Sequence, residues 1–257
     1  MLTGNLLMVD ACCVWKQAST IKALVCSGLC ADGYRREQNG TSVAMSMGQT
    51  VTYIDMKTLV VFNHPYGGSY CSAILEAVED GVKDGGQECR VINLDQDDFD
   101  PVMRAKDLIA FSGAGRVGES ALGTVDELVL EYKKDLEWAD HLVMIFPIWW
   151  MTMPAMMKGF VDKVIFPAVA YNMDKGKLVS RLPIRKVTVI TTMNTPADVY
   201  RDSFNNSIEG SLIKGTFRQI GIEDIQWISL NGVKQASQEQ RVTWLDDIYQ
   251  QFAGGNL

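Results

Sequence analysis

The stretch HLVMIFPIWWMTMP, residues 141–154, decides the fold because it joins a buried strand to an aromatic loop. The nearly all-apolar run from His141 to Phe146 is typical of a strand covered on both faces of a parallel sheet. Pro147 has no N–H to donate, so it is predicted to end the strand. Pro154 then begins a helix.

The loop between that strand and that helix carries two indoles and two thioethers. Open α/β sheets bind ligands at the carboxyl ends of their strands, where this loop lies. The segment Pro147–Met153 therefore favours a flat, apolar, polarizable ligand. The alternative is that Trp149, Trp150 and the neighbouring methionines belong to the core.

Apolar runs of strand length alternate with helical patterns from residue 57 onward. Strands are predicted at residues 58–63, 89–94, 141–146, 185–192 and 226–230. Helices are predicted after the cap at Ser69, after capping boxes that begin at Thr124 and Ser237, and over residues 203–220. This alternation predicts an α/β fold: a flavodoxin-like three-layer sandwich whose five-stranded parallel sheet has the order 2-1-3-4-5.

Two further loops follow strands that adjoin the central strand in this order. The turn from His64 to Ser69 supplies free backbone N–H groups and a capping hydroxyl, which suit a phosphate. The alternative is an ordinary strand-to-helix turn with Ser69 as N-cap. Thr191 to Thr195 place polar groups after the fourth strand. We expect these two loops and the tryptophan loop to meet in one crevice.

Two other motifs are assigned no ligand. Gly113–Gly118 matches G-x-G-x-x-G, but it does not follow the first strand and is predicted to be a mobile loop. The acidic run Asp95–Asp100 lacks the glycine and glutamate of an EF-hand loop, so a solvated turn is expected.

Composition excludes several classes of function. The net charge of −7 argues against a nucleic-acid surface, and two histidines exclude a His-rich metal site. Six cysteines without paired spacing indicate reduced thiols and a cytoplasmic protein. No apolar run reaches membrane-spanning length. Residues 1–55 differ from the rest and are predicted to be a poorly ordered N-terminal extension, ahead of a flavodoxin-like domain at residues 56–257.

Four segments resemble the flavodoxin-like NAD(P)H:quinone oxidoreductase family, which includes DT-diaphorase and bacterial modulators of drug activity. They are HPYGGSYCSAI (64–74), LEWADHLVMIFPIWWMTMPAMMKGFVDKV (136–164), PAVAY (167–171) and TTMNTPADVY (191–200). The resemblance implies bound FMN or FAD, NAD(P)H as co-substrate, and two-electron transfer to a quinone or similar acceptor. It implies that the flavin is held by His64, Gly68, Ser69, Tyr70, Cys71, Pro147, Ile148, Trp149, Trp150, Thr191, Thr192, Met193 and Asn194.

The chain departs from this family at three positions. Cys71 stands where asparagine is common, and Met193-Asn194 stand where two glycines are common. Asn206 is nearest in spacing to a histidine that some relatives use, so Tyr200 or water would serve in proton transfer, and Tyr200 is the catalytic candidate. The resemblance also implies a homodimer. Alternatives are a flavodoxin-type electron carrier and a flavin-binding regulatory subunit of a transport system.

Overall fold

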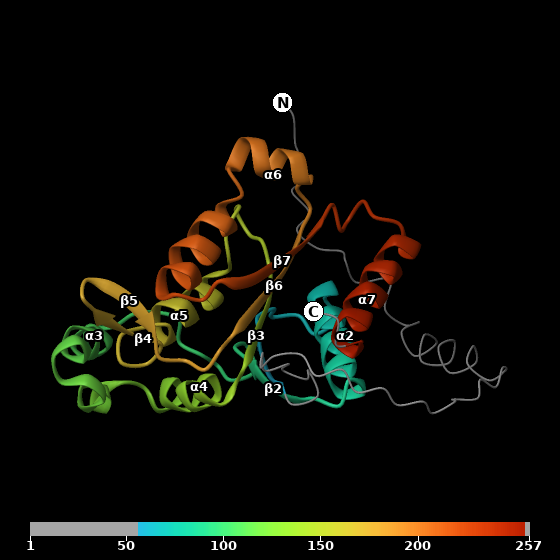
Figure 1. Ribbon diagram of the computed structural model, residues 1–257. Helices are drawn as coiled ribbons and strands as arrows, with labels where there is room; N and C mark the ends of the chain where they lie inside the picture. The colour runs from blue at the N-terminus through green and yellow to red at the C-terminus, as the bar shows by residue number, and fades with distance from the viewer. Residues whose placement is uncertain (1–55, 255–257) are drawn as a thin grey trace, which may run out of the picture. The chain divides into compact units, whose positions relative to one another are not determined.

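The computed structural model describes residues 56–254 of the chain, and a five-stranded parallel sheet lies at its centre (Figure 1). The strands run in the order β2-β1-β3-β6-β7, which is the predicted order 2-1-3-4-5. Their bounds are β1 Lys57–Phe62, β2 Glu88–Asn93, β3 His141–Pro147, β6 Lys186–Met193 and β7 Asp224–Asn231. The prediction for residues 1–55 lies outside the described residues.

Helices cover both faces of the sheet (Figure 1). One face packs against α2 (Tyr70–Asp84) and α7 (Gln238–Ala253), and the other against α4 (Glu127–Trp138) and α5 (Ala155–Val164). Every residue of β3 is buried, and successive side chains enter opposite cores: Leu142 joins the α4 and α5 side, Val143 the α2 and α7 side. The apolar run in β3 therefore serves two cores at once.

Both serine caps are confirmed. The Oγ atoms of Ser69 and Ser237 accept hydrogen bonds from the backbone N–H groups of Ser72 and Gln240, each at 3.1 Å. The capping box predicted at Thr124 is wrong. Helix α4 begins three residues later, at Glu127, and the Thr124 hydroxyl donates to the Lys106 carbonyl instead.

The mobile loop predicted for Gly113–Gly118 is also wrong. Helix α3 (Ala105–Val117) runs through the motif, and the 3₁₀ helix η3 (Gly118–Thr124) follows. A Cβ atom at Gly113 would lie 2.9 Å from the Cβ of Ala121, so the missing side chain lets these two segments pack closely. The φ of 62° at Gly118 then ends α3, a conformation that glycine adopts without steric cost.

The helix predicted over residues 203–220 is interrupted. Helix α6 (Ala197–Phe204) ends at Asn205 and Asn206, whose φ values are 52° and 45°. Asparagine tolerates this left-handed backbone better than most residues do, so the pair can interrupt the helix. The π-helix η4 (Glu209–Phe217) and the 3₁₀ helix η5 (Arg218–Ile220) follow.

The segment of residues 167–182, which precedes β6, contains a short antiparallel hairpin, β4 (Tyr171–Asp174) and β5 (Lys177–Ser180). It pairs with itself and not with the central sheet. Within residues 56–254, no helix combines the length and apolar character required to cross a bilayer.

One buried histidine makes the stability of this fold depend on pH. His141 begins β3, has no exposed surface, and lies with Nε2 2.8 Å from the Thr188 hydroxyl. Burial, with a smaller effect from Lys186, lowers its pKa to about 3, against 6.5 in an unfolded chain. Below pH 6.5 the unfolded state therefore binds a proton that the native state does not.

We expect the free energy of unfolding to fall as the pH is lowered from 6.5 towards 3, with His141 contributing up to about 1.4 kcal/mol per pH unit. Urea unfolding of wild type and His141→Asn at several pH values measures this. The variant should show a flatter profile, whereas His64→Asn should retain most of the slope. Equal slopes for wild type and His141→Asn would contradict the assignment.

Candidate functional site

The Gly-Ser turn, residues 64–69, joins β1 to α2 and leaves several backbone donors free. The N–H groups of Gly67, Gly68, Tyr70 and Cys71 have no hydrogen-bond partner among residues 56–254. They lie at or beside the start of a 15-residue helix, where the helix dipole favours negative charge. The arrangement can bind a phosphate.

His64 connects this turn to the tryptophan loop. Its Nδ1 accepts a hydrogen bond from the Tyr66 N–H at 3.1 Å, so the proton of the neutral imidazole is on Nε2. The ring meets Trp149 edge-on, with centroids 6.2 Å apart. Burial lowers the pKa of His64, although Asp95 opposes the shift. The first two predicted loops are therefore adjacent in space.

The indole turn, residues 149–152, is a tight two-residue turn. The N–H of Trp149 donates to the Thr152 carbonyl at 2.9 Å, and the N–H of Thr152 donates back at 3.1 Å. Between them Trp150 and Met151 have φ values of 49° and 64°, positions that favour asparagine and glycine. Their own N–H groups have no partner among the described residues. The turn combines backbone strain, two free donors and, in Trp150, an indole that is 90% exposed.

Thr192 joins the third loop to the other two. It is in register with Pro147, and its carbonyl accepts a hydrogen bond from the Ile148 N–H at 2.8 Å. Its hydroxyl lies 3.2 Å from the Cys71 Sγ in the first turn of α2. Burial raises the pKa of the Cys71 thiol to about 12, so it stays neutral. The three strand ends thus meet at one edge of the sheet.

Three predicted site residues direct their side chains elsewhere. Thr191 faces the opposite side of the sheet from Thr192 and accepts a hydrogen bond from Trp227 Nε1 at 3.0 Å. The Tyr70 hydroxyl donates to the Arg241 carbonyl at 2.7 Å, against α7. The Asn194 Oδ1 accepts from the Lys234 N–H at 3.0 Å. These residues, and Met193, which is buried, can serve a ligand at this edge of the sheet only through their backbone.

Tyr200, the catalytic candidate, lies behind the indole turn and is 1% exposed. Its hydroxyl is 3.0 Å from the Met151 carbonyl oxygen and 2.9 Å from the Ser207 Oγ. The Ser207 hydroxyl also donates to the Met151 carbonyl. Ser207 was not predicted from the sequence, because the left-handed pair Asn205-Asn206 that orients it leaves no periodic signal.

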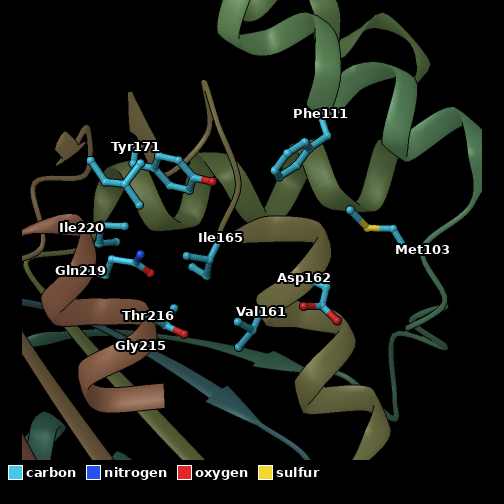
Figure 2. A pocket seen from close by; sticks show the side chains of 11 residues that line it. Met103, Phe111, Val161, Asp162, Ile165, Tyr171, Gly215, Thr216, Gln219 and Ile220 are labelled. Atoms are coloured by element: carbon cyan, nitrogen blue, oxygen red, sulfur yellow. The ribbon is translucent and has the colours of Figure 1, made fainter. Parts of the chain in front are cut away.

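A cavity of about 330 Å³ lies between α5, the β4–β5 hairpin and η4 (Figure 2). Tyr171 and Phe111 face one another across it. Of the segments that carry the family resemblance, PAVAY contributes Tyr171 and the long central segment contributes Val161 and Asp162. None of the predicted site residues lines this cavity. Among the described residues, no group of three His, Cys, Asp or Glu side chains is placed to hold a metal ion.

Comparison with known proteins gives a family and several relatives. A family model described as "Flavodoxin-like fold" matches residues 56–252. An uncharacterized NAD(P)H oxidoreductase of Haemophilus influenzae is 25% identical over 174 residues, which cover 67% of this chain and 82% of that protein. The FMN-dependent NADH:quinone oxidoreductase of Ruegeria pomeroyi is 26% identical over 186 residues, covering 67% and 87%.

Among solved structures, the NAD(P)H:quinone oxidoreductase of Methanothermobacter marburgensis superposes with a TM-score of 0.69 at 20% identity. The match covers 79% of this chain and 98% of that one, and it shows that the two share a fold.

The strain in the indole turn can be tested by substitution. Trp150→Asn should raise the free energy of unfolding of the protein without ligand by about 1 kcal/mol, because asparagine tolerates a φ of 49° and little packing is lost. Trp149→Asn should lower it, since Trp149 has no left-handed backbone and contacts His64. Denaturant unfolding measures both. Equal destabilisation by the two substitutions would contradict the interpretation.

Proposed function

The chain belongs to the flavodoxin-like fold family, and from that premise we propose that it is a flavin-dependent NAD(P)H oxidoreductase that transfers two electrons to quinones or similar acceptors. The observation that carries the proposal is the meeting of three strand-end loops, with free N–H groups in two of them and a half-exposed indole in one. The relative from Haemophilus influenzae supports NAD(P)H, and that from Ruegeria pomeroyi supports FMN and a quinone.

The residues present fit a flavin mononucleotide. The free amides of the Gly-Ser turn suit its phosphate, and Ser69 fixes the start of the helix that presents them. A Cβ at Gly68 would lie 2.6 Å from the Tyr66 hydroxyl oxygen, so the missing side chain lets the exposed Tyr66 ring lie against the turn. Trp149, with 45% of its surface exposed, and the apolar Pro147 and Ile148 suit an aromatic ring.

A bound flavin would supply the hydride-accepting and electron-donating chemistry, and the protein would supply position and polarity. The free N–H groups of Trp150 and Met151 can stabilise negative charge on a ligand beside the indole turn. Cys71 and Thr192 meet between the Gly-Ser turn and the end of β6, where the neutral thiol introduces no negative charge. His64 keeps a proton on Nε2 in its neutral form.

The Tyr200 hydroxyl is engaged with the backbone of the indole turn, so we propose that it acts by holding that turn. Water and His64 are then the candidate proton donors. A homodimer and a cytoplasmic location complete the proposal, from the family resemblance and from the cysteine content. Cys71 and Cys89 are both unpaired thiols, as a reducing setting would allow.

We expect purified protein to be yellow, or to become yellow with FMN, and to oxidise NADH or NADPH in the presence of menadione. An absorption spectrum, mass analysis of the released chromophore and a nicotinamide oxidation assay measure this. Yellow protein that is inert to both nicotinamides would favour the electron carrier or the regulatory subunit. Protein that stays colourless with both FMN and FAD would contradict every flavin assignment.

The two capping serines form a matched pair for testing the phosphate site. Ser69→Ala and Ser237→Ala each remove an equivalent cap, so each should lower the free energy of unfolding by about 1 kcal/mol. Ser69→Ala should also weaken FMN binding by about tenfold, a loss comparable to one hydrogen bond near a charged group. Fluorescence titration with FMN measures the difference. Equal FMN affinity in the two variants would place the phosphate elsewhere.

A further inference from the structure

The indole turn adopts a conformation that its own sequence disfavours. Trp150 and Met151 are consecutive non-glycine residues with left-handed backbones, and their Cβ atoms crowd the neighbouring carbonyl groups. The two hydrogen bonds between Trp149 and Thr152 close the turn but do not fix its direction relative to the sheet. Surrounding contacts must therefore hold it in place.

Those contacts converge on one backbone atom. The Met151 carbonyl oxygen accepts hydrogen bonds from the hydroxyls of Tyr200 and Ser207, and the two hydroxyls are themselves 2.9 Å apart. The Ile208 N–H donates to the Tyr200 hydroxyl oxygen at 3.3 Å. We call this group, Tyr200, Ser207 and the Met151 carbonyl, the carbonyl clamp. Tyr200 is 1% exposed and Ile208 is fully buried, so water competes poorly for these bonds.

Ser207 reaches the clamp through a second unusual backbone segment. Asn205 and Asn206 are both left-handed, and the Asn206 N–H donates to the Tyr200 carbonyl at 3.1 Å. The chain thereby turns back towards Tyr200 after α6, and the Ser207 side chain meets Met151, 56 residues earlier in the sequence. Two costly backbone segments, at residues 150–151 and 205–206, are joined by this clamp.

We propose that Ser207 is a positioning residue of the flavin site. Through the carbonyl clamp it holds the indole turn so that the free N–H groups of Trp150 and Met151 keep one orientation towards the ligand. The proposal rests on the proposed function for the identity of the ligand, but the clamp itself can be tested without any ligand. The proposal also gives Tyr200 a positioning role in which its hydroxyl proton is not transferred to the substrate.

The test compares Ser207→Ala, Ser207→Thr and Ser211→Ala. The first removes the clamp hydroxyl, the second keeps a hydroxyl, and the third is a control, because the Ser211 hydroxyl bonds to the Ser207 carbonyl in the same helical segment without touching the turn. In flavin-free protein, hydrogen exchange at the Trp149 and Thr152 amides should be about five- to tenfold faster in Ser207→Ala, as expected for the loss of about one hydrogen bond. Ser207→Thr and Ser211→Ala should match wild type.

With FMN added, Ser207→Ala should bind about fivefold more weakly and show a more negative flavin midpoint potential, because donors near the reduced ring are less well held. Ser207→Thr should restore both values. If exchange in Ser207→Ala equals that of wild type, the clamp does not hold the turn and the proposal is overturned. If exchange rises but affinity and potential do not change, the clamp is structural and the positioning role is overturned.

Tyr200→Phe provides a second route should Ser207→Ala fold poorly. It removes the other hydroxyl of the clamp. The increase in exchange rate in the double variant should be smaller than the product of the increases in the two single variants, because both hydroxyls bond to one acceptor. Independent, multiplicative effects would count against a shared clamp. Wild-type protein that binds neither FMN nor FAD would refute the proposed function, while the exchange comparison would still decide the clamp.

Discussion

Burial of β3 on both faces is the constraint on which the site depends. A strand whose successive side chains enter two different cores must have neighbours on both edges and helices on both faces. Since β1 and β6 are those neighbours and run parallel to β3, their carboxyl ends must lie together. The Gly-Ser turn, the indole turn and the loop after Thr192 meet because of this sheet order, although residues 64 and 192 are far apart in the chain.

The alternation of side chains that builds the sheet also decides which side chains lie on the same face as the Gly-Ser turn. Thr191 and Thr192 are adjacent in β6, and the twofold period of a strand sends them to opposite faces. Thr192 therefore contacts Cys71 in α2, while Thr191 contacts Trp227 in the other core. The family resemblance assigns both threonines to the site. The geometry shows that Thr192 can contribute its side chain, whereas Thr191 can contribute only its backbone.

Features with a short-range cause could be predicted from the sequence. The five strands and the caps at Ser69 and Ser237 follow from apolar periodicity and from hydrogen bonds that span three residues, and the strand order follows from the alternation of strands and helices in a doubly wound fold. The failures arise where a contact from outside the local sequence replaces the expected one: the Thr124 hydroxyl is predicted to cap a helix but donates to the Lys106 carbonyl, 18 residues earlier. Gly113 is predicted to lie in a mobile loop, but it lies in α3, where its missing side chain allows close packing against Ala121 of η3. Ser207 was missed because its role depends on Met151, which no local pattern connects to it.

The indole turn shows why a functional site can contradict local preference. Asparagine and glycine would suit the backbone at residues 150 and 151, but they would remove an indole and a thioether from the carboxyl edge of the sheet. The chain keeps the larger side chains and offsets the strain with hydroxyl groups contributed from behind the turn. A clamped turn has its N–H donors oriented before a ligand binds, so binding costs less conformational entropy. The buried position of Tyr200 follows from the same requirement, since a hydroxyl that bonds to the Met151 carbonyl from the core side is not exposed to a ligand.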